Sequence, residues 1–317
     1  MIIKSLKHKG STVKISTDQG SCSFETSSSL SFENLEHYEI NTLDDLLKLP
    51  HELHLPLLGL HEKKWKLIKN TTKIPRPLVV VLEKSVGIRE FLLVSYDAKS
   101  FSDSYEAIED ACSLFYKKLK RAGYTVKDGV LLDNSVEEKD LLMLLKESVE
   151  AVLSEYSFTL RLGVAFHNYN DGRYVYANRS FDDDGQVSFV RDLVRAYDIG
   201  YVEAPFYETQ LQHYKKLKED IFQNCLVCYT SKIKEFTVGL FEECFSAVLL
   251  NYHLLSDFRD NIEAFREHDV VTAAPVSLRS LFVLLGYEIV LARFLFGDRN
   301  LVKSFKKAEI SLREGVR

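Results

Sequence analysis

The sequence predicts an α/β fold in two parts, a small α+β domain followed by a barrel-like α/β domain. Apolar and polar positions alternate across residues 1–40, the period-two pattern of half-buried strands. From Leu78 onwards, strand-length apolar runs alternate with helix-length amphipathic segments, which is typical of a parallel sheet covered by helices. The two prolines of Ile74–Pro77 fix an extended chain between these regions. The predicted domains are therefore residues 1–75 and 76–317.

Strands and short helices make up the predicted first domain. Thr12–Gly20 is a period-two strand closed by a turn, and Ser21–Thr26 is its returning partner. Residues 42–69 are helical in character and open with a Thr-Leu-Asp-Asp capping signal. We expect Pro50 and Pro56 to break this region into short pieces, because proline disrupts a helix interior.

The second domain is predicted to repeat a strand–helix unit. Strands are expected at residues 78–82, 91–95, 159–165, 201–202, 225–229, 247–250 and 270–272. Helices are expected at residues 102–122, 136–155, 187–197, 208–220, 236–246 and 256–267. An apolar run from Leu281 to Phe296, interrupted by Glu288 and Arg293, is too short for a membrane span and is predicted to form a buried final helix. This number of units predicts a closed or nearly closed barrel.

Composition narrows the class of protein. The 317 residues carry a formal net charge of −5, so no global positive charge supports nucleic-acid binding. The N-terminal residues lack the apolar segment of a signal peptide, and we expect no membrane association. The five cysteines form an odd, scattered set, which fits a reducing compartment better than a disulfide framework. The sequence therefore predicts a cytoplasmic protein.

Several short motifs follow one another in a recognisable order. They read Lys9-Gly-Ser-Thr-Val13, Pro75-Arg-Pro-Leu-Val-Val-Val-Leu82, Arg89-Glu-Phe-Leu92, Ser100-Phe-Ser-Asp-Ser-Tyr-Glu-Ala107, Arg161-Leu-Gly-Val-Ala165, Asn170-Asp-Gly-Arg-Tyr174, Tyr201-Val-Glu-Ala-Pro-Phe206 and Thr272-Ala-Ala-Pro275. In this order the chain resembles the enolases, whose strand I-E-D-P-F corresponds to the motif around Glu203. The resemblance implies a small α+β cap domain, a TIM-barrel-like α/β domain and a homodimer. About one strand–helix unit of the family lacks a counterpart between Asn251 and Val271, which leaves open an incomplete or irregularly closed barrel.

The resemblance also locates the family's metal site. Enolases hold Mg²⁺ through three carboxylates at strand ends, and the corresponding positions here are Ala165, Glu203 and the pair Cys228–Tyr229. A hard divalent cation prefers several oxygen ligands, and one carboxylate out of three is a poor site. We therefore expect no cofactor, with Mg²⁺ binding weak or absent.

The resemblance implies further losses among the catalytic positions. The general-base Lys of the family corresponds to Asn251, and the Lys that anchors substrate corresponds to Val271. Of the opposing acid pair, Glu90 remains and Lys127 replaces its partner. Catalytic groups of this kind act as a unit. Their joint loss predicts that the protein lacks enolase (phosphopyruvate hydratase) activity.

Three functions remain open after these losses. The first is a catalytically inactive enolase-like protein that acts as a scaffold, regulator or binding module for an unidentified protein partner. The second is an enzyme of altered chemistry, with a rebuilt cluster of Glu90, Lys127, His167, Glu203 and Asn251. The third is association with nucleic acid or a larger complex through lysine-rich helices. Their basic residues are Lys117, Lys118, Lys120, Arg121, Lys215, Lys216 and Lys218.

Two smaller motifs have plain structural interpretations. Cys225 and Cys228 have C-x-x-C spacing, but they lie in a predicted apolar strand without a second pair, so we expect buried core cysteines. The acidic run Asp182–Gly185 lacks the spacing of a calcium loop and is predicted to be a solvated loop before a helix.

A remaining Glu at a barrel strand end is more often paired structurally than catalytic, and we expect this for Glu90 and Glu203.

Overall fold

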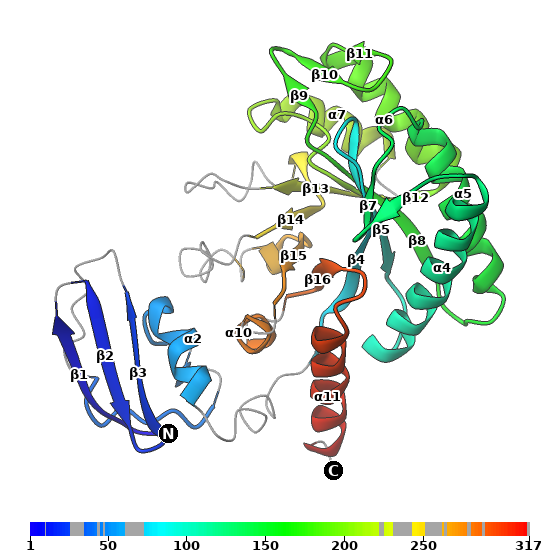
Figure 1. Ribbon diagram of the computed structural model, residues 1–317. Coiled ribbons are helices and arrows are strands. Elements are labelled where there is room, and N and C mark those ends of the chain that lie inside the picture. The colour runs from blue at the N-terminus through cyan, green and yellow to red at the C-terminus, as the bar shows by residue number, and fades with distance from the viewer. Residues whose placement is uncertain are drawn as a thin grey trace. The chain divides into compact units, whose positions relative to one another are not determined.

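The computed structural model describes residues 1–9, 11–25, 35–42, 45–46, 48–60, 73–221, 225–230, 243–250, 262, 265–277, 280–286 and 289–315. The chain divides into two compact units. One unit contains Met1–Ile74, Val276–Glu288 and Asn300–Arg317, and the other contains Pro75–Pro275 and Ile289–Arg299. Figure 1 shows the helices and strands of both units.

A three-stranded antiparallel sheet forms the base of the first unit. Its strands, joined in sequence order, are β1 (Ile3–Lys9), β2 (Thr12–Thr17) and β3 (Gly20–Glu25). In β2 the alternate residues Val13 and Ile15 are fully buried, as the period-two pattern predicted. This unit also contains helix α2 (His51–Leu60), helix α10 (Leu281–Gly286) and most of helix α11 (Arg299–Gly315).

Helix α2 departs from the prediction for its region. It runs through Pro56, so the expectation that Pro56 breaks the helix is wrong. A proline inside a helix removes one backbone donor, and the turns on either side can still form. The predicted helical residues 61–69 lie outside the described part of the chain.

Among the described residues, eight strands of the second unit form a closed barrel. The strands are β4 (Arg76–Glu83), β5 (Ile88–Ser95), β8 (Leu160–Phe166), β12 (Ile199–Glu203), β13 (Leu226–Thr230), β14 (Ala247–Leu249), β15 (Val271–Pro275) and β16 (Leu291–Leu295). They pair in this order, and β16 pairs with β4 to complete the ring. The TIM-barrel-like architecture is confirmed, and the alternative of an incomplete barrel is wrong.

Four long helices pack on the outside of the barrel strands. They are α4 (Phe101–Arg121), α5 (Glu138–Leu153), α6 (Asp183–Tyr197) and α7 (Leu211–Ile221). In Figure 1 they follow one another around the barrel, α4 beside β4 and β5, α5 beside β8, α6 beside β12 and α7 beside β13. The four helices confirm the predicted alternation within a few residues at each end. The predicted helices 236–246 and 256–267 lie mostly outside the described residues.

Two groups of short strands lie outside the eight-stranded ring. The hairpin β6 (Val126–Lys127) and β7 (Val130–Leu131) extends the edge of β4. Strands β9 (Tyr169–Asn170), β10 (Arg173–Val175) and β11 (Ser180–Phe181) form a separate antiparallel sheet between β8 and α6. In the described part of the chain, no helix has the length and apolar character needed to cross a membrane.

The predicted final apolar helix is wrong. Helix α10 ends at Gly286, and Leu291–Leu295 is the last barrel strand, β16. A barrel strand packs side chains on both faces, so its sequence is apolar almost throughout, and periodicity does not distinguish it from a buried helix segment. As a result, Arg293 belongs to a barrel strand.

One barrel strand also runs against the expected direction. Strand β5 is antiparallel to both of its neighbours, β4 and β8, so the sheet is mixed and not wholly parallel. The connection from β4 to β5 is a hairpin of four residues, 84–87, and a parallel crossover needs many more. Because β5 is reversed, its first residues, including Glu90, lie at the rim where the other barrel strands end.

An ion pair fixes this hairpin. The fully buried Lys84 Nζ donates to Glu138 Oε1 at 3.1 Å and to the carbonyl oxygen of Val136 at 2.5 Å. Gly87 adopts a φ of 79°, and a Cβ there would lie 2.2 Å from the same Glu138 oxygen. Only glycine fits both the backbone angle and the space. The connection is therefore a tight turn held against the start of α5.

Candidate functional site

Four barrel positions lie in one row at the rim where the strands end. Glu90 is the strand partner of Ala165, Ala165 of Glu203, and Glu203 of Cys228. Neighbouring strands lie about 4.8 Å apart, so side chains in this row are close neighbours. Ala165, Glu203 and Cys228 are at most 1% exposed. The structure therefore brings together the residues that the sequence analysis assigned to the metal strands and Glu90, the remaining acid of the acid pair.

The side chain of Arg293 joins the two carboxylates of this row. Its Nε donates to Glu203 Oε2 at 3.1 Å, and its Nη2 donates to Glu90 Oε2. The Tyr201 hydroxyl donates to the same Glu203 oxygen at 3.0 Å. Strand β16 is a neighbour of neither β5 nor β12, so Arg293 reaches both acids across the barrel interior. We call Glu90, Tyr201, Glu203 and Arg293 the Arg293 cluster.

Burial and the neighbouring charges together determine the pKa values in the Arg293 cluster. It raises the pKa of Glu90 above its usual range, and this effect exceeds the opposing influence of the Arg293 charge. Burial alone lowers the pKa of Arg293, but the charges of Glu203 and Glu90 outweigh it and raise the pKa overall. Burial also raises the pKa of Tyr201, which keeps its hydroxyl protonated as a donor to Glu203. The cluster thus holds a permanent internal cation.

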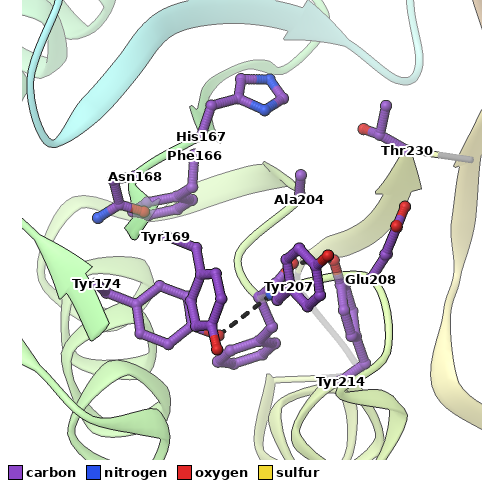
Figure 2. A pocket seen from close by; sticks show the side chains of 11 residues that line it. Phe166, His167, Asn168, Tyr169, Tyr174, Ala204, Tyr207, Glu208, Tyr214 and Thr230 are labelled. Atoms are coloured by element: carbon purple, nitrogen blue, oxygen red, sulfur yellow. Dashed lines mark hydrogen bonds between the residues drawn. The ribbon is translucent and has the colours of Figure 1, made fainter. Parts of the chain in front are cut away.

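A pocket of about 290 Å³ opens beside the Arg293 cluster, among the residues that follow β8, β12 and β13 (Figure 2). Aromatic side chains provide most of its lining: Phe166, Tyr169, Tyr174, Phe206, Tyr207 and Tyr214. Ala204, which directly follows Glu203, also lines the pocket and has a φ of 47°. A positive φ is uncommon for a residue with a Cβ and marks local backbone strain. The strand end that supplies Glu203 to the cluster therefore turns sharply into this aromatic pocket.

Ring contacts and one hydrogen-bond network hold the aromatic pocket together. The rings of Tyr169 and Tyr207 are stacked, with centroids 4.7 Å apart and planes at 21°. The Tyr174 hydroxyl accepts from the backbone N–H of Tyr207 at 3.2 Å, a bond drawn in Figure 2, and contacts Gln210 Oε1. The Gln210 amide donates to Asp183 at 2.6 Å. The network ties the pocket to the first turn of α6.

Polar side chains complete the lining of the aromatic pocket. They are His167, Asn168, Glu208 and Thr230. The Thr230 Oγ1 atom is buried and makes no hydrogen bond within the described structure. In Figure 2, His167 and Thr230 lie on one side of the space, while Tyr169, Tyr174 and Tyr214 lie on the other. His167 and Thr230 therefore lie across the pocket from these tyrosines.

Curated proteins similar to this chain are enolases. The chain is 25% identical to the enolase of Archaeoglobus fulgidus over 167 residues, which are 49% of this chain and 41% of that protein. It is 24% identical to the enolase of Natronomonas pharaonis over 186 residues, 56% of this chain and 47% of the relative. It is 23% identical to the enolase of Saccharolobus solfataricus over 227 residues, 65% of this chain and 53% of the relative.

The chain is a distant relative of the enolases. It spans about half the length of the curated enolases it matches. No protein-family model matches the sequence. The sequence motifs, the order of the barrel strands and the curated relatives all agree on an enolase-like protein.

Enolase relationship implies a Mg²⁺ site, and the residues at the rim do not fit one. Ala165 and Cys228 offer no oxygen ligand, and the Tyr229 hydroxyl donates to the backbone oxygen of Glu208 at 3.5 Å. The remaining carboxylate, Glu203, accepts hydrogen bonds from Arg293 and Tyr201. Across the described residues, no group of three His, Cys, Asp or Glu side chains could hold a metal ion. A hard cation would have to displace an arginine that already neutralises the site.

The other positions implied by the enolase resemblance are dispersed. Lys127 lies in β6 with an exposed side chain, and in the described structure no ion pair joins it to Glu90 or Glu203. Val271 begins β15, the seventh barrel strand, and the eighth strand is β16. His167 is exposed at the aromatic pocket. Asn251 lies outside the described residues. Of the five residues proposed as a rebuilt cluster, the described contacts join Glu90 and Glu203, through Arg293.

The lysine-rich faces lie on two separate helices, and several of their charges are compensated. Lys118 pairs with Glu147 at 2.5 Å, Lys215 with Glu243 at 2.9 Å and Lys216 with Asp184 at 2.9 Å. Lys218 Nζ donates to the backbone oxygen of Phe245 at 3.0 Å. Around the barrel, α5 and α6 lie between α4 and α7 (Figure 1). The two faces therefore do not form one continuous basic surface.

The smaller motifs resolve into structural roles. Cys225 and Cys228 are buried and unpaired, as predicted, and burial raises the pKa of both thiols. The acidic run 182–185 is not a loop. Asp182 caps helix α6 by accepting from the backbone N–H of Gly185 at 2.9 Å, and the next acidic residues form its first turn. Carboxylates at this end of a helix interact favourably with the helix dipole.

Sequence reasoning missed the two features that define the rim. Arg293 was taken as an interruption of a helix, although a single arginine inside a short apolar run is itself a signal of an internal ion pair. The aromatic pocket had a weaker signal, since Tyr169 and Tyr207 lie in the connections that follow the predicted strands 159–165 and 201–202. Which of these side chains meet could not be read from the chain.

Proposed function

We propose that this enolase-like protein has no phosphopyruvate hydratase activity and acts as a non-enzymatic scaffold, regulator or binding module. One observation supports the proposal above all, the hydrogen bonding of Arg293 to both Glu90 and Glu203. In the enolase resemblance these rim positions bind a metal and move a proton. Here a side chain of the chain itself neutralises them.

The residues at the other catalytic positions also argue against the enolase reaction. Removing a proton next to a carboxylate requires a base and a cation that stabilises the developing charge. Asn251 stands at the position of the base and is not basic. The positive charge of Arg293 is neutralised by its ion pairs with Glu90 and Glu203. Lys127 lies in the β6–β7 hairpin, outside this cluster. These losses affect the same step, so no partial activity is expected.

An unidentified protein partner and a homodimer belong to the same proposal. The homodimer rests on the relationship to enolases alone, and the partner on the loss of the catalytic groups. Size-exclusion chromatography with light scattering tests the homodimer. Affinity purification from the native cells at moderate salt tests the partner, and recovery of the protein alone would count against a scaffold.

A direct activity measurement tests the central claim. The purified protein is incubated with phosphoenolpyruvate and excess Mg²⁺, and loss of the enol absorbance is followed, with an archaeal enolase at equal concentration as the positive control. We expect no Mg²⁺-dependent turnover. A rise in melting temperature with Mg²⁺ is also not expected, because only a ligand that prefers the folded state stabilises it. Mg²⁺-dependent turnover by the purified chain would refute the proposal.

A further inference from the structure

We propose that the aromatic pocket is a binding site for a small organic cation of the alkylammonium class. The pocket is lined by the residues that follow Ala165, Glu203 and Tyr229 in the chain, and the inference does not depend on the absence of enolase activity. Its volume of about 290 Å³ is close to the lower end of small-molecule pockets, roughly 300–1,000 Å³. The ligand is therefore small.

Electron-rich ring faces dominate the lining. Tyr169 and Tyr207 stack on each other, and Tyr174 meets Tyr169 with centroids 5.1 Å apart and planes at 58°. Phe206 continues the wall, with its ring edge-on to Tyr214 at 5.2 Å. Several aromatic side chains that line one small pocket are the feature shared with the aromatic cages that bind quaternary ammonium groups. Tyr207 is 44% exposed, so part of this wall is accessible from outside.

The lining charges select a cation. Glu208 contributes a carboxylate to the pocket, and it forms no ion pair with Lys or Arg within the described structure. The described lining contains no Lys or Arg of its own. Burial raises the pKa of Tyr174 and Tyr214, so both rings stay neutral and keep their negative faces. An anion would meet repulsion from Glu208 and from the ring faces, whereas a cation is attracted by both.

Two further features indicate a built site. The Thr230 hydroxyl is buried at the pocket without a hydrogen-bond partner, a costly arrangement that a polar arm of a ligand would relieve. Ala204 holds a strained positive φ at the pocket wall. Both features are adjacent to barrel strand ends, the usual position of ligand sites in this architecture. Together they favour an ammonium group with a short polar arm.

Isothermal titration of the full-length protein with choline tests the proposal. The matched ligand control is the uncharged isostere of choline in which carbon replaces nitrogen. We expect saturable binding of choline and binding of the isostere about tenfold weaker or worse, because the isostere carries no charge for the aromatic rings to attract. Inorganic phosphate, which has the opposite charge, is expected not to bind at this site.

Variants locate the site. Tyr207→Ala removes an exposed ring and is expected to weaken choline binding about tenfold without unfolding the protein. Glu208→Gln keeps the size and removes the charge, and a several-fold loss is expected. Tyr197→Ala, a partly exposed tyrosine of α6 outside the pocket lining, is the control and should bind choline as the unaltered protein does.

Three outcomes would overturn the proposal. Equal affinity for choline and its uncharged isostere would show a plain apolar pocket. Unchanged choline affinity in folded Tyr207→Ala and Glu208→Gln proteins would place the binding elsewhere. Absence of saturable choline binding by the folded protein would remove the site altogether. None of these outcomes bears on phosphopyruvate hydratase activity, which the separate assay measures.

Discussion

The Arg293 cluster and the aromatic pocket meet at the end of one strand, where Glu203 points to the cluster and Ala204 lines the pocket. The polar groups of the two regions differ in their hydrogen bonding. In the cluster, each carboxylate accepts a hydrogen bond from Arg293. In the pocket, the Thr230 hydroxyl has no partner in the described structure, and Glu208 is among the lining residues. The comparison shows that a barrel rim can neutralise one group of residues with its own side chains and keep an open pocket in the connections beside it.

The largest effect on stability should come from breaking the Arg293 cluster. Arg293→Met removes the cation and leaves two carboxylates without it, so we expect a loss of about 3–5 kcal/mol in the free energy of unfolding. Chemical denaturation with urea measures the loss. Arg191→Met, which disrupts a surface pair of 3.6 Å with Asp220, should cost less than about 1 kcal/mol.

A combined variant sharpens that prediction. Adding Glu90→Gln and Glu203→Gln to Arg293→Met removes the uncompensated charges, and most of the lost stability should return. If the combined variant is as unstable as the sum of its parts, the three groups do not act as one cluster. Loss of less than about 1 kcal/mol in Arg293→Met itself would contradict the buried bridge.

A smaller loss is expected from Glu203→Gln. The amide keeps the shape of the side chain but weakens the hydrogen bonds from Arg293 and Tyr201, and hydrogen bonds to charged groups contribute about 1.5–3 kcal/mol. The free energy of unfolding measures the effect. Tyr201→Phe removes one of the two donors and should cost less than Glu203→Gln, and the reverse order would argue against Arg293 as the main partner.

The pocket should respond with the opposite sign. Thr230→Val replaces an unpartnered buried hydroxyl by a methyl group of similar size, so we expect stabilisation by about 1 kcal/mol in the absence of ligand. Thermal or chemical unfolding measures the change. Destabilisation by Thr230→Val would mean that the hydroxyl makes a hydrogen bond in solution, and the contrast between the two regions would then fail.

The smallest expected effect is a pH dependence. Burial raises the folded-state pKa of Glu90 above its ordinary value of 4.5, so the folded protein binds this proton more tightly than the unfolded chain. The associated stability is fully present below pH 4.5 and is lost as pH rises through the raised pKa. Melting temperature measured against pH should therefore fall less steeply above pH 4.5 for Glu90→Gln than for the unaltered protein. Identical slopes would show that Glu90 titrates normally.

How much of this was readable from the sequence depends on the range of the interaction. The elements around Tyr201 and Val202 were predicted because local periodicity and strand length determine them. The strand at Arg293 was not, because a segment apolar on both faces has the same composition as a buried helix. The bridge itself joins residues 203 positions apart, Glu90 and Arg293, and only barrel closure brings them together.

The candidate site shows the same limit. The resemblance to enolases assigned Ala165 and Glu203 to a metal site and Glu90 to an acid pair, and strand order makes these three positions neighbours. It could not show that a residue of the last strand would reach into this row. Nor could it show a pocket, because the positions of Tyr169 and Tyr207 depend on the turns that follow β8 and β12.

The Arg293 bridge has a consequence for how the barrel depends on its surroundings. A bound metal ion stabilises a fold only in proportion to its concentration in solution relative to its dissociation constant. A tethered guanidinium is present at a fixed, high effective concentration in every molecule, whatever the medium contains. The stability of this barrel rim should therefore not depend on the concentration of divalent ions. A chelator that removes the metal from a metal-dependent relative should leave the stability of this protein unchanged.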